Sequence, residues 1–143
     1  DHTGGLDGFL KANKNKAKVI WPDKKESFKI IKGIYSTGAL GVFIKEQSLI
    51  INSDKGLIII TGCAHPGIVN IVKKVKAQFE KDIYLVIGGF HHPSIEVARE
   101  FRDLGIKKVV PSHCTGDEAI KAFKEEYQED FIKSGAGKII RIE

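Results

Sequence analysis

The pattern of apolar and polar positions changes near residue 56 of the 143-residue chain. Before that point, short apolar runs alternate with turn residues, which is typical of β-strands joined by tight connections. A short helix is expected around Leu6 and Phe9. Strands are predicted at residues 18–21, 28–35, 40–45 and 48–52. The last of these is expected to pair with residues 57–61 as a hairpin around the turn at 54–56.

After residue 56, apolar strands alternate with helical patterns. Strands at 57–61, 84–87 and 109–110 each lead into a short loop with Gly or Pro. The first helix is predicted to begin at Pro66, and Ser94 and Thr115 are expected to cap the next two. Apolar residues recur at helical spacing in all three: Ile68, Val72, Val75 and Phe79, then Val97, Phe101 and Leu104, then Ile120, Phe123 and Tyr127. With a final strand at 138–142, this pattern favours a layered α/β architecture.

Each of the three strand-to-helix loops carries histidine. His65 lies in the first loop, His91 and His92 in the second, and His113 in the third. In an open α/β sheet, ligands bind beyond the carboxyl ends of the strands, and neutral histidine is the commonest metal ligand. Any one of these residues has a structural alternative as a loop or helix-start residue. Independent packing roles do not explain the same topological position three times, so at least two are predicted to bind metal.

The two cysteines lie close in sequence to two of these histidines. Cys63 stands two residues before His65, and Cys114 follows His113. Zinc accepts thiolate ligands, but cysteine is also a common small buried residue. The residue type leaves both roles open, so neither cysteine joins the predicted ligand set.

Composition narrows the class of protein. The hydrophobic fraction of 42% suits one domain with a core, and no apolar run approaches the roughly 18 residues of a membrane span. Two cysteines are too few for a disulfide framework, which favours the cytoplasm. The net charge of +5 comes mainly from scattered lysines, densest at 11–18, and favours a solvated loop over phosphate or nucleic-acid contact. Abundant Lys, Glu and Ile without Met is typical of a thermophile.

Three segments resemble the metallo-β-lactamase superfamily: residues 1–6 (Asp-His-Thr-Gly-Gly-Leu), 61–67 (Thr-Gly-Cys-Ala-His-Pro-Gly) and 111–113 (Pro-Ser-His). The superfamily signature is His-x-His-x-Asp-His, and Asp1-His2 resembles its end. The amino-acid sequences of the three histidine loops are similar to those of one branch of the superfamily. This branch is the archaeal dihydropteroate-synthase-like enzymes, which make a dihydropterin–ribofuranosylaminobenzene phosphate.

The resemblance implies a four-layer αββα sandwich with two metal sites at one edge of its sheets. It places His65 on the first metal, and Asp1, His2 and His113 on the second. The aspartate that usually bridges the metals has no counterpart in the loop after residue 87. His91 is expected to replace it as a ligand or to act as an acid–base group, so Asp1 and His91 are the predicted catalytic residues.

The implied cofactor is a pair of divalent metal ions, with zinc preferred to manganese or iron. A zinc-type ion lowers the pKa of its bound water to about 7. The leading hypothesis is a metal-dependent enzyme that acts on a phosphorylated or pyrophosphorylated small molecule by group transfer with release of pyrophosphate. The alternatives are a superfamily hydrolase of phosphodiesters or other esters, nucleases included, and a non-catalytic module that binds metal or ligand.

The chain begins at Asp1 and contains no Met, so it is expected to be a fragment. The chain is expected to be the C-terminal portion, residues 1–143, of a single metallo-β-lactamase-like domain. Its companion would be the N-terminal half, without which we expect an inactive or poorly folded fragment with an exposed apolar sheet face. The other expected partner is the phosphorylated substrate. Nucleic acid and membrane are not expected, and a homo-oligomer stays open.

Overall fold

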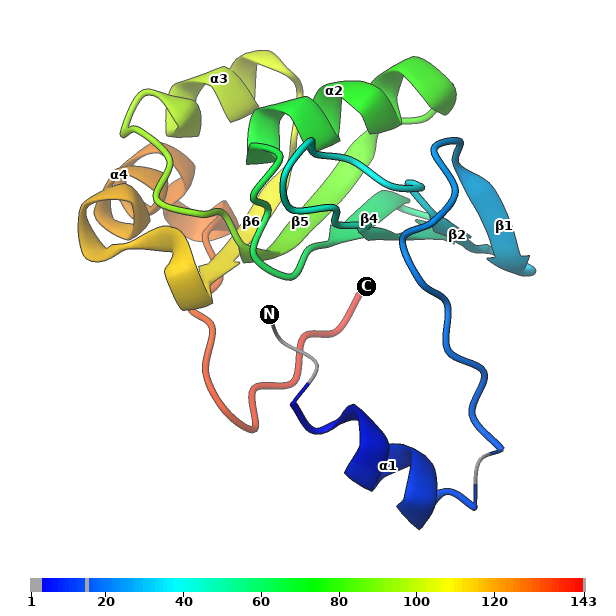
Figure 1. Ribbon diagram of the computed structural model, residues 1–143. Helices are drawn as coiled ribbons and strands as arrows, with labels where there is room; N and C mark the ends of the chain where they lie inside the picture. Colours follow the sequence, from blue (N-terminus) through cyan, green and yellow to red (C-terminus); the bar gives the residue numbers. More distant parts are fainter. Residues whose placement is uncertain (1–3, 15, 143) are drawn as a thin grey trace.

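The computed structural model describes residues 4–14 and 16–142, and its centre is a six-stranded mixed sheet (Figure 1). The strands are β1 (Phe28–Ile31), β2 (Ile34–Ser36), β3 (Leu49–Ser53), β4 (Gly56–Ile60), β5 (Ile83–Gly89) and β6 (Lys108–Ser112), and they are ordered in space as in the sequence. Strands β1 to β4 are antiparallel neighbours, whereas β4, β5 and β6 run parallel. The predicted α/β class is therefore confirmed.

A helix follows each of the three parallel strands. These helices are α2 (Ile68–Gln78), α3 (Val97–Asp103) and α4 (Asp117–Tyr127), preceded by α1 (Leu6–Ala12) and accompanied by the short turns η1 (His113–Thr115) and η2 (Gln128–Asp130). Helices α2, α3 and α4 cover one face of the sheet (Figure 1). Because β4, β5 and β6 are parallel, their carboxyl ends meet at one edge, and the three histidine loops leave the sheet there. Among the described residues, no helix is long and apolar enough to cross a membrane.

The main core lies between the sheet and these helices. Four aromatic side chains form its centre, with Phe123 5.3 Å from both Phe90 and Phe101, and 6.1 Å from Tyr127, between ring centroids. Aromatic pairs at such separations add about 0.5–1.5 kcal/mol beyond area burial. Phe90 is 1% exposed and immediately precedes His91. The core therefore holds the start of the second histidine loop.

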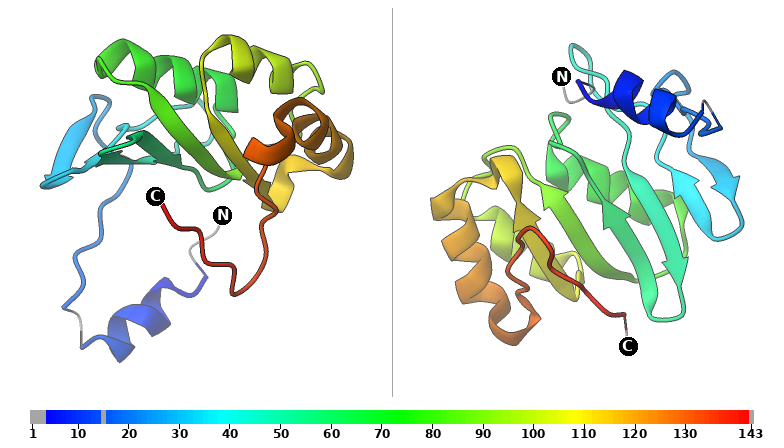
Figure 2. Two further views of the ribbon diagram at one scale, coloured as in Figure 1. Left: turned by 180° about the vertical axis from the view of Figure 1, so that it is seen from behind. Right: turned by 90° about the horizontal axis from the view of Figure 1, so that it is seen from below.

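The opposite face of the sheet has a smaller apolar cluster. Ile58, Leu85 and Val110 are buried there, and Ile132 and Ile140 from the C-terminal segment pack against them. Figure 2 shows this segment crossing the face that the helices leave uncovered, with α1 on the same side. Helix α1 itself buries no residue. Among the described residues, cover on this face is thus thinner than on the helical face.

Several local predictions are confirmed and others are wrong. The β3–β4 hairpin and the helix near Phe9 form as predicted. Residues 28–35 make two strands, because a turn at Gly33, with φ of +79°, divides them. Residues 18–21, 40–45 and 138–142 form no named strand. These segments pair with no strand of the sheet, and 40–45 has only the bridge between Leu40 and Glu46.

The helix starts are displaced from the predicted caps. Helix α2 begins two residues after Pro66, because Gly67 has a φ of +90° that no helix accepts. Glu96 rather than Ser94 is the N-cap of α3, and Gly116 rather than Thr115 is that of α4. The Thr115 hydroxyl instead donates to the Ser112 carbonyl at 2.7 Å.

Candidate metal centre

The three histidine loops converge at the carboxyl edge of the parallel strands. The rings of His65 and His91 have centroids 4.3 Å apart, although they come from different loops. His113, from the third loop, places Nε2 3.1 Å from Sγ of Cys63 in the first. The structure therefore brings together the three strand ends that the sequence predicted to share a site.

Backbone hydrogen bonds fasten the loops to one another. Gly89 N donates to Gly62 O at 2.9 Å, and the Thr61 hydroxyl donates to Gly89 O at the same distance. His92 N donates to Cys114 O at 2.8 Å, which joins the second loop to the third. These bonds continue the sheet ladder beyond the strands and join the three loops into one platform.

Non-glycine residues with left-handed backbone gather in this platform. Ala64 has a φ of 65°, His91 of 52°, His92 of 46° and His113 of 50°. Each such residue costs on the order of 1 kcal/mol, and strain of this kind concentrates at functional sites. Three of the four histidines in these loops are thus held in conformations that the surrounding hydrogen bonds must enforce.

Two overlapping groups of metal donors form in this platform. Cys63, His113 and Cys114 make one group, and Glu46, Cys63 and His65 make the other. Within each group the donor atoms lie within 4.8 Å of one another. Imidazole, thiolate and carboxylate are the donors that zinc binds in proteins, so the residues present fit a transition-metal ion.

Glu46 orients His65. One carboxylate oxygen accepts a hydrogen bond from Nδ1 of the ring, and the other accepts one from the His65 backbone N–H at 3.0 Å. Since a carboxylate only accepts, Nδ1 carries the proton and Nε2 keeps its lone pair for a ligand. Metal-binding histidines are usually held in this way. Glu46 could not be predicted from the sequence, because it lies in the loop before β3 with no motif around it.

Cys63 is buried where the two donor groups meet. Burial, together with the neighbouring Cys114 thiol, raises the pKa of Cys63 to about 11 from an ordinary 9.0. A cation at the site would favour the thiolate and oppose this shift. Gly89 provides the space, because a Cβ there would stand 2.9 Å from Cys114 Sγ and 3.2 Å from Cys63 Cα.

The chain is similar to known proteins in both sequence and structure. No known family model matches the chain. The chain is 33% identical to the 7,8-dihydropterin-6-methyl-4-(β-D-ribofuranosyl)-aminobenzene-5′-phosphate synthase of Methanocaldococcus jannaschii, over 96% of this chain. The crystal structure of Tm1679, described as a metal-dependent hydrolase of the β-lactamase superfamily, superposes on 96% of the chain with a TM-score of 0.80 and 28% identity. The chain belongs to the metallo-β-lactamase superfamily.

A B3 metallo-β-lactamase shares the fold at 16% identity, with a TM-score of 0.51 over 94% of this chain and 52% of its own. The chain spans 58% of the length of the archaeal synthase and 62% of Tm1679. The mixed sheet and its helices are thus consistent with part of a metallo-β-lactamase fold.

The other candidate site residues are Asp1, His2 and His92. Asp1 and His2 lie outside the described residues. His92 is exposed, and its ring lies beside Gly116 at the start of α4. There it lines an open hollow of about 500 Å³ together with Pro93 and residues 115–119. Of the adjacent pair, His91 is the one beside the donor groups.

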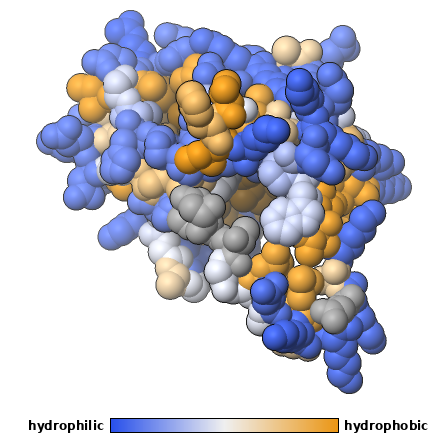
Figure 3. All heavy atoms as spheres, viewed as in Figure 1, coloured by the Kyte–Doolittle hydropathy of each residue, from blue (hydrophilic) through white to orange (hydrophobic). Residues whose placement is uncertain are grey.

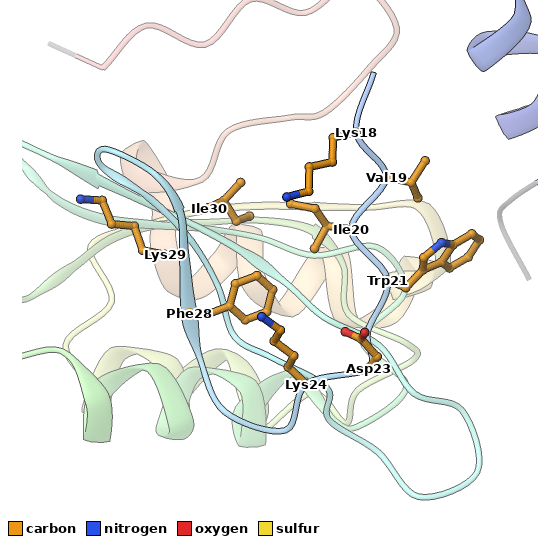
Figure 4. Close-up of a pocket in the computed structure, with 9 residues that line it drawn as sticks. All are labelled: Lys18, Val19, Ile20, Trp21, Asp23, Lys24, Phe28, Lys29 and Ile30. Carbon is orange, nitrogen blue, oxygen red and sulfur yellow. The ribbon is translucent and has the colours of Figure 1, made fainter. Parts of the chain in front are cut away.

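Two further surface features lie on the chain before β4. A hollow of about 280 Å³ is lined by three lysines, Asp23 and the aromatic rings of Trp21 and Phe28, among other residues (Figure 4). Lys24 Nζ lies 4.9 Å from the centroid of the Phe28 ring. The lining includes no histidine or cysteine. This hollow is therefore separate from the donor groups.

The loop before β3 exposes apolar side chains. Val42, Phe43 and Ile44 are 85%, 99% and 46% exposed, although Glu46 in the same loop reaches the site. Figure 3 shows apolar surface gathered near the middle of this view, where Figure 1 has the loop in cyan. An apolar surface therefore lies close to the candidate centre.

Proposed function

We propose that this chain is the metal-binding part of a metal-dependent enzyme that acts on a phosphorylated or pyrophosphorylated small molecule. The observation that carries the proposal is the meeting of His65, His91 and His113 from three separate loops, with Cys63 between them. The similarity to a synthase whose product carries a 5′-phosphate supports the substrate class.

The residues have distinct proposed roles. His65 would bind a divalent ion through Nε2, because Glu46 engages Nδ1. His113 would bind through Nε2, which already faces the buried thiol. A bound ion of the zinc type supplies Lewis acidity and lowers the pKa of its water to about 7. His91 is exposed and stands beside the His65 ring, so it can bind metal or move a proton.

The reaction is proposed to be transfer with release of pyrophosphate. The open hollow beside His92 offers room for a small molecule next to the site. Asp117 and Glu118 line that hollow, so a phosphate group would lie on its metal side rather than against the start of α4. Because the chain spans less than two thirds of its relatives, the activity belongs to the whole protein, with Asp1, His2 and a companion N-terminal region as further proposed contributors.

Hydrolysis is the second candidate reaction. Its support is the 28% identity to Tm1679, which is described as a metal-dependent hydrolase. Both reactions need the same metal-binding residues. They separate in an assay that follows pyrophosphate release from a hydroxymethylpterin diphosphate with an arylamine acceptor. Phosphodiester cleavage without any pyrophosphate release would reject the transferase.

Metal content tests the site itself. The purified chain, loaded with Zn²⁺ and dialysed, is expected to retain at least one equivalent by elemental analysis. His65→Ala and His113→Ala should each lose metal, whereas His92→Ala is the matched control and should keep it. Circular dichroism of each variant checks folding. Unchanged metal content in both of the first two variants would defeat the proposed site.

A further inference from the structure

The thiol of Cys63 is the one donor that both groups share. It lies within 4.8 Å of the donor atoms of His113 and Cys114, and within the same distance of those of Glu46 and His65. The two cysteines of the chain stand on different loops, 51 residues apart, yet Cys114 Sγ approaches the Cys63 carbonyl at 3.4 Å. A small residue selected only for packing would not need this concentration of donors.

The separations are close to those of a filled site. With metal–sulfur and metal–nitrogen distances near 2.3 and 2.0–2.1 Å, two ligands of a tetrahedral ion lie roughly 3.5 Å apart. The contact between Cys63 Sγ and His113 Nε2 is 3.1 Å, a hydrogen-bond length. The two atoms need to separate by only about half an ångström to receive an ion.

The surrounding backbone prepares the space. Cys63 is 4% exposed, and Gly89 lies against it without a side chain. The same loops carry the strained backbone of Ala64 and His113, which aims the first and third loops at each other. Since thiolates select zinc and similar ions over magnesium and manganese, the identity of this donor decides which metal the site prefers.

We propose that Cys63 binds the metal through its thiolate, beside His113, and so makes the site selective for a thiophilic divalent cation. This rests on the proposed function and adds the ligand that sets its metal. On binding, the S–H bond breaks, the proton leaves to the solvent and a metal–sulfur bond forms. Cys114 stands next to this ligand as the less buried second thiol.

Cobalt(II) added to the 143-residue chain tests the proposal. Co²⁺ replaces Zn²⁺ in such sites, and a thiolate ligand gives an intense sulfur-to-cobalt charge-transfer band in the near ultraviolet, distinct from the weak visible bands of imidazole sites. We expect the band in the wild-type chain. Zn²⁺ should abolish it at equimolar concentration, and excess Mg²⁺ should leave it unchanged.

Two matched variants assign the band. The chain has two cysteines, so a band that persists in Cys114→Ser comes from Cys63. Cys63→Ser should abolish it and weaken Zn²⁺ binding by more than the roughly 10–100-fold loss typical of an outer-shell partner. Should Cys63→Ser fail to fold, Cys114→Ser alone decides the assignment. Loss of the band in Cys114→Ser, or its survival in Cys63→Ser, would overturn it.

The outcomes also separate this inference from the proposed function. Visible cobalt bands without a charge-transfer band would show that imidazoles hold the metal and Cys63 does not, which overturns the inference alone. Failure to bind Co²⁺ or Zn²⁺ at all would overturn both.

Discussion

Gly89→Ala tests whether close contact between the first two histidine loops builds the site. An alanine Cβ at this position would stand 2.5 Å from Gly62 O and 3.2 Å from Cys63 Cα. Both are backbone atoms, so rotation of a side chain cannot relieve the clash. The loops must move apart, which also stretches the 2.9 Å hydrogen bond from Gly89 N to Gly62 O.

The size of the effect follows from these contacts. Overpacking of this kind costs typically 1–3 kcal/mol, and a weakened hydrogen bond adds up to about 1 kcal/mol. Replacing Gly by Ala also restricts the unfolded chain, which returns about 0.4–1 kcal/mol. The expected net loss in the free energy of unfolding is about 2 kcal/mol.

Gly62→Ala is the matched control. A Cβ on Gly62 meets nothing within 4 Å, and neither glycine has a positive φ. Both variants gain the same restriction of the unfolded chain, so their difference isolates the clash. The clash and the weakened hydrogen bond together cost about 2.5 kcal/mol before that shared restriction is subtracted. Urea unfolding followed by circular dichroism should therefore place the Gly89→Ala midpoint about 1.3 M below that of Gly62→Ala, for a slope near 2 kcal/mol per molar. Equal midpoints would refute the argument.

Two further predictions concern side chains away from that contact. Glu46→Gln should lower Zn²⁺ affinity by about 10–100-fold, because His65 loses the carboxylate that orients it. An equilibrium titration measures the affinity, and circular dichroism should stay unchanged. Unaltered affinity would contradict this. Burial raises the pKa of Tyr127 far above its ordinary 10.0, so its contribution to stability is complete below pH 10.0 and declines as the pH rises above that value. Tyr127→Phe should remove this alkaline decline. At neutral pH it should lower the free energy of unfolding by about 1 kcal/mol, because the 3.2 Å hydrogen bond from the Tyr127 hydroxyl to Ile106 O is lost. Unfolding curves measured at several pH values check both effects.

The parallel half of the fold could be predicted from the sequence because its signals are local. Apolar strands, Gly or Pro loops and helical spacing recur three times, and parallel pairing then carries all three loops to one edge. The approach of His65 to His91 follows from this placement. The predicted strands at 18–21, 40–45 and 138–142 do not form, because local signals alone do not determine whether such a segment is a strand. An apolar alternation becomes a strand only where another strand offers its edge, and that is a property of the assembled sheet.

The composition of the donor groups is likewise decided by tertiary contact. Glu46 enters from a loop 19 residues before His65, and Cys63 meets His113 across 50 residues. No spacing rule covers such separations, because the packing of loops, not the periodicity of the chain, sets them. The histidine positions could thus be found in the one-dimensional pattern. The carboxylate that orients one of them and the thiol that lies between them became visible only when the strands had brought their loops together.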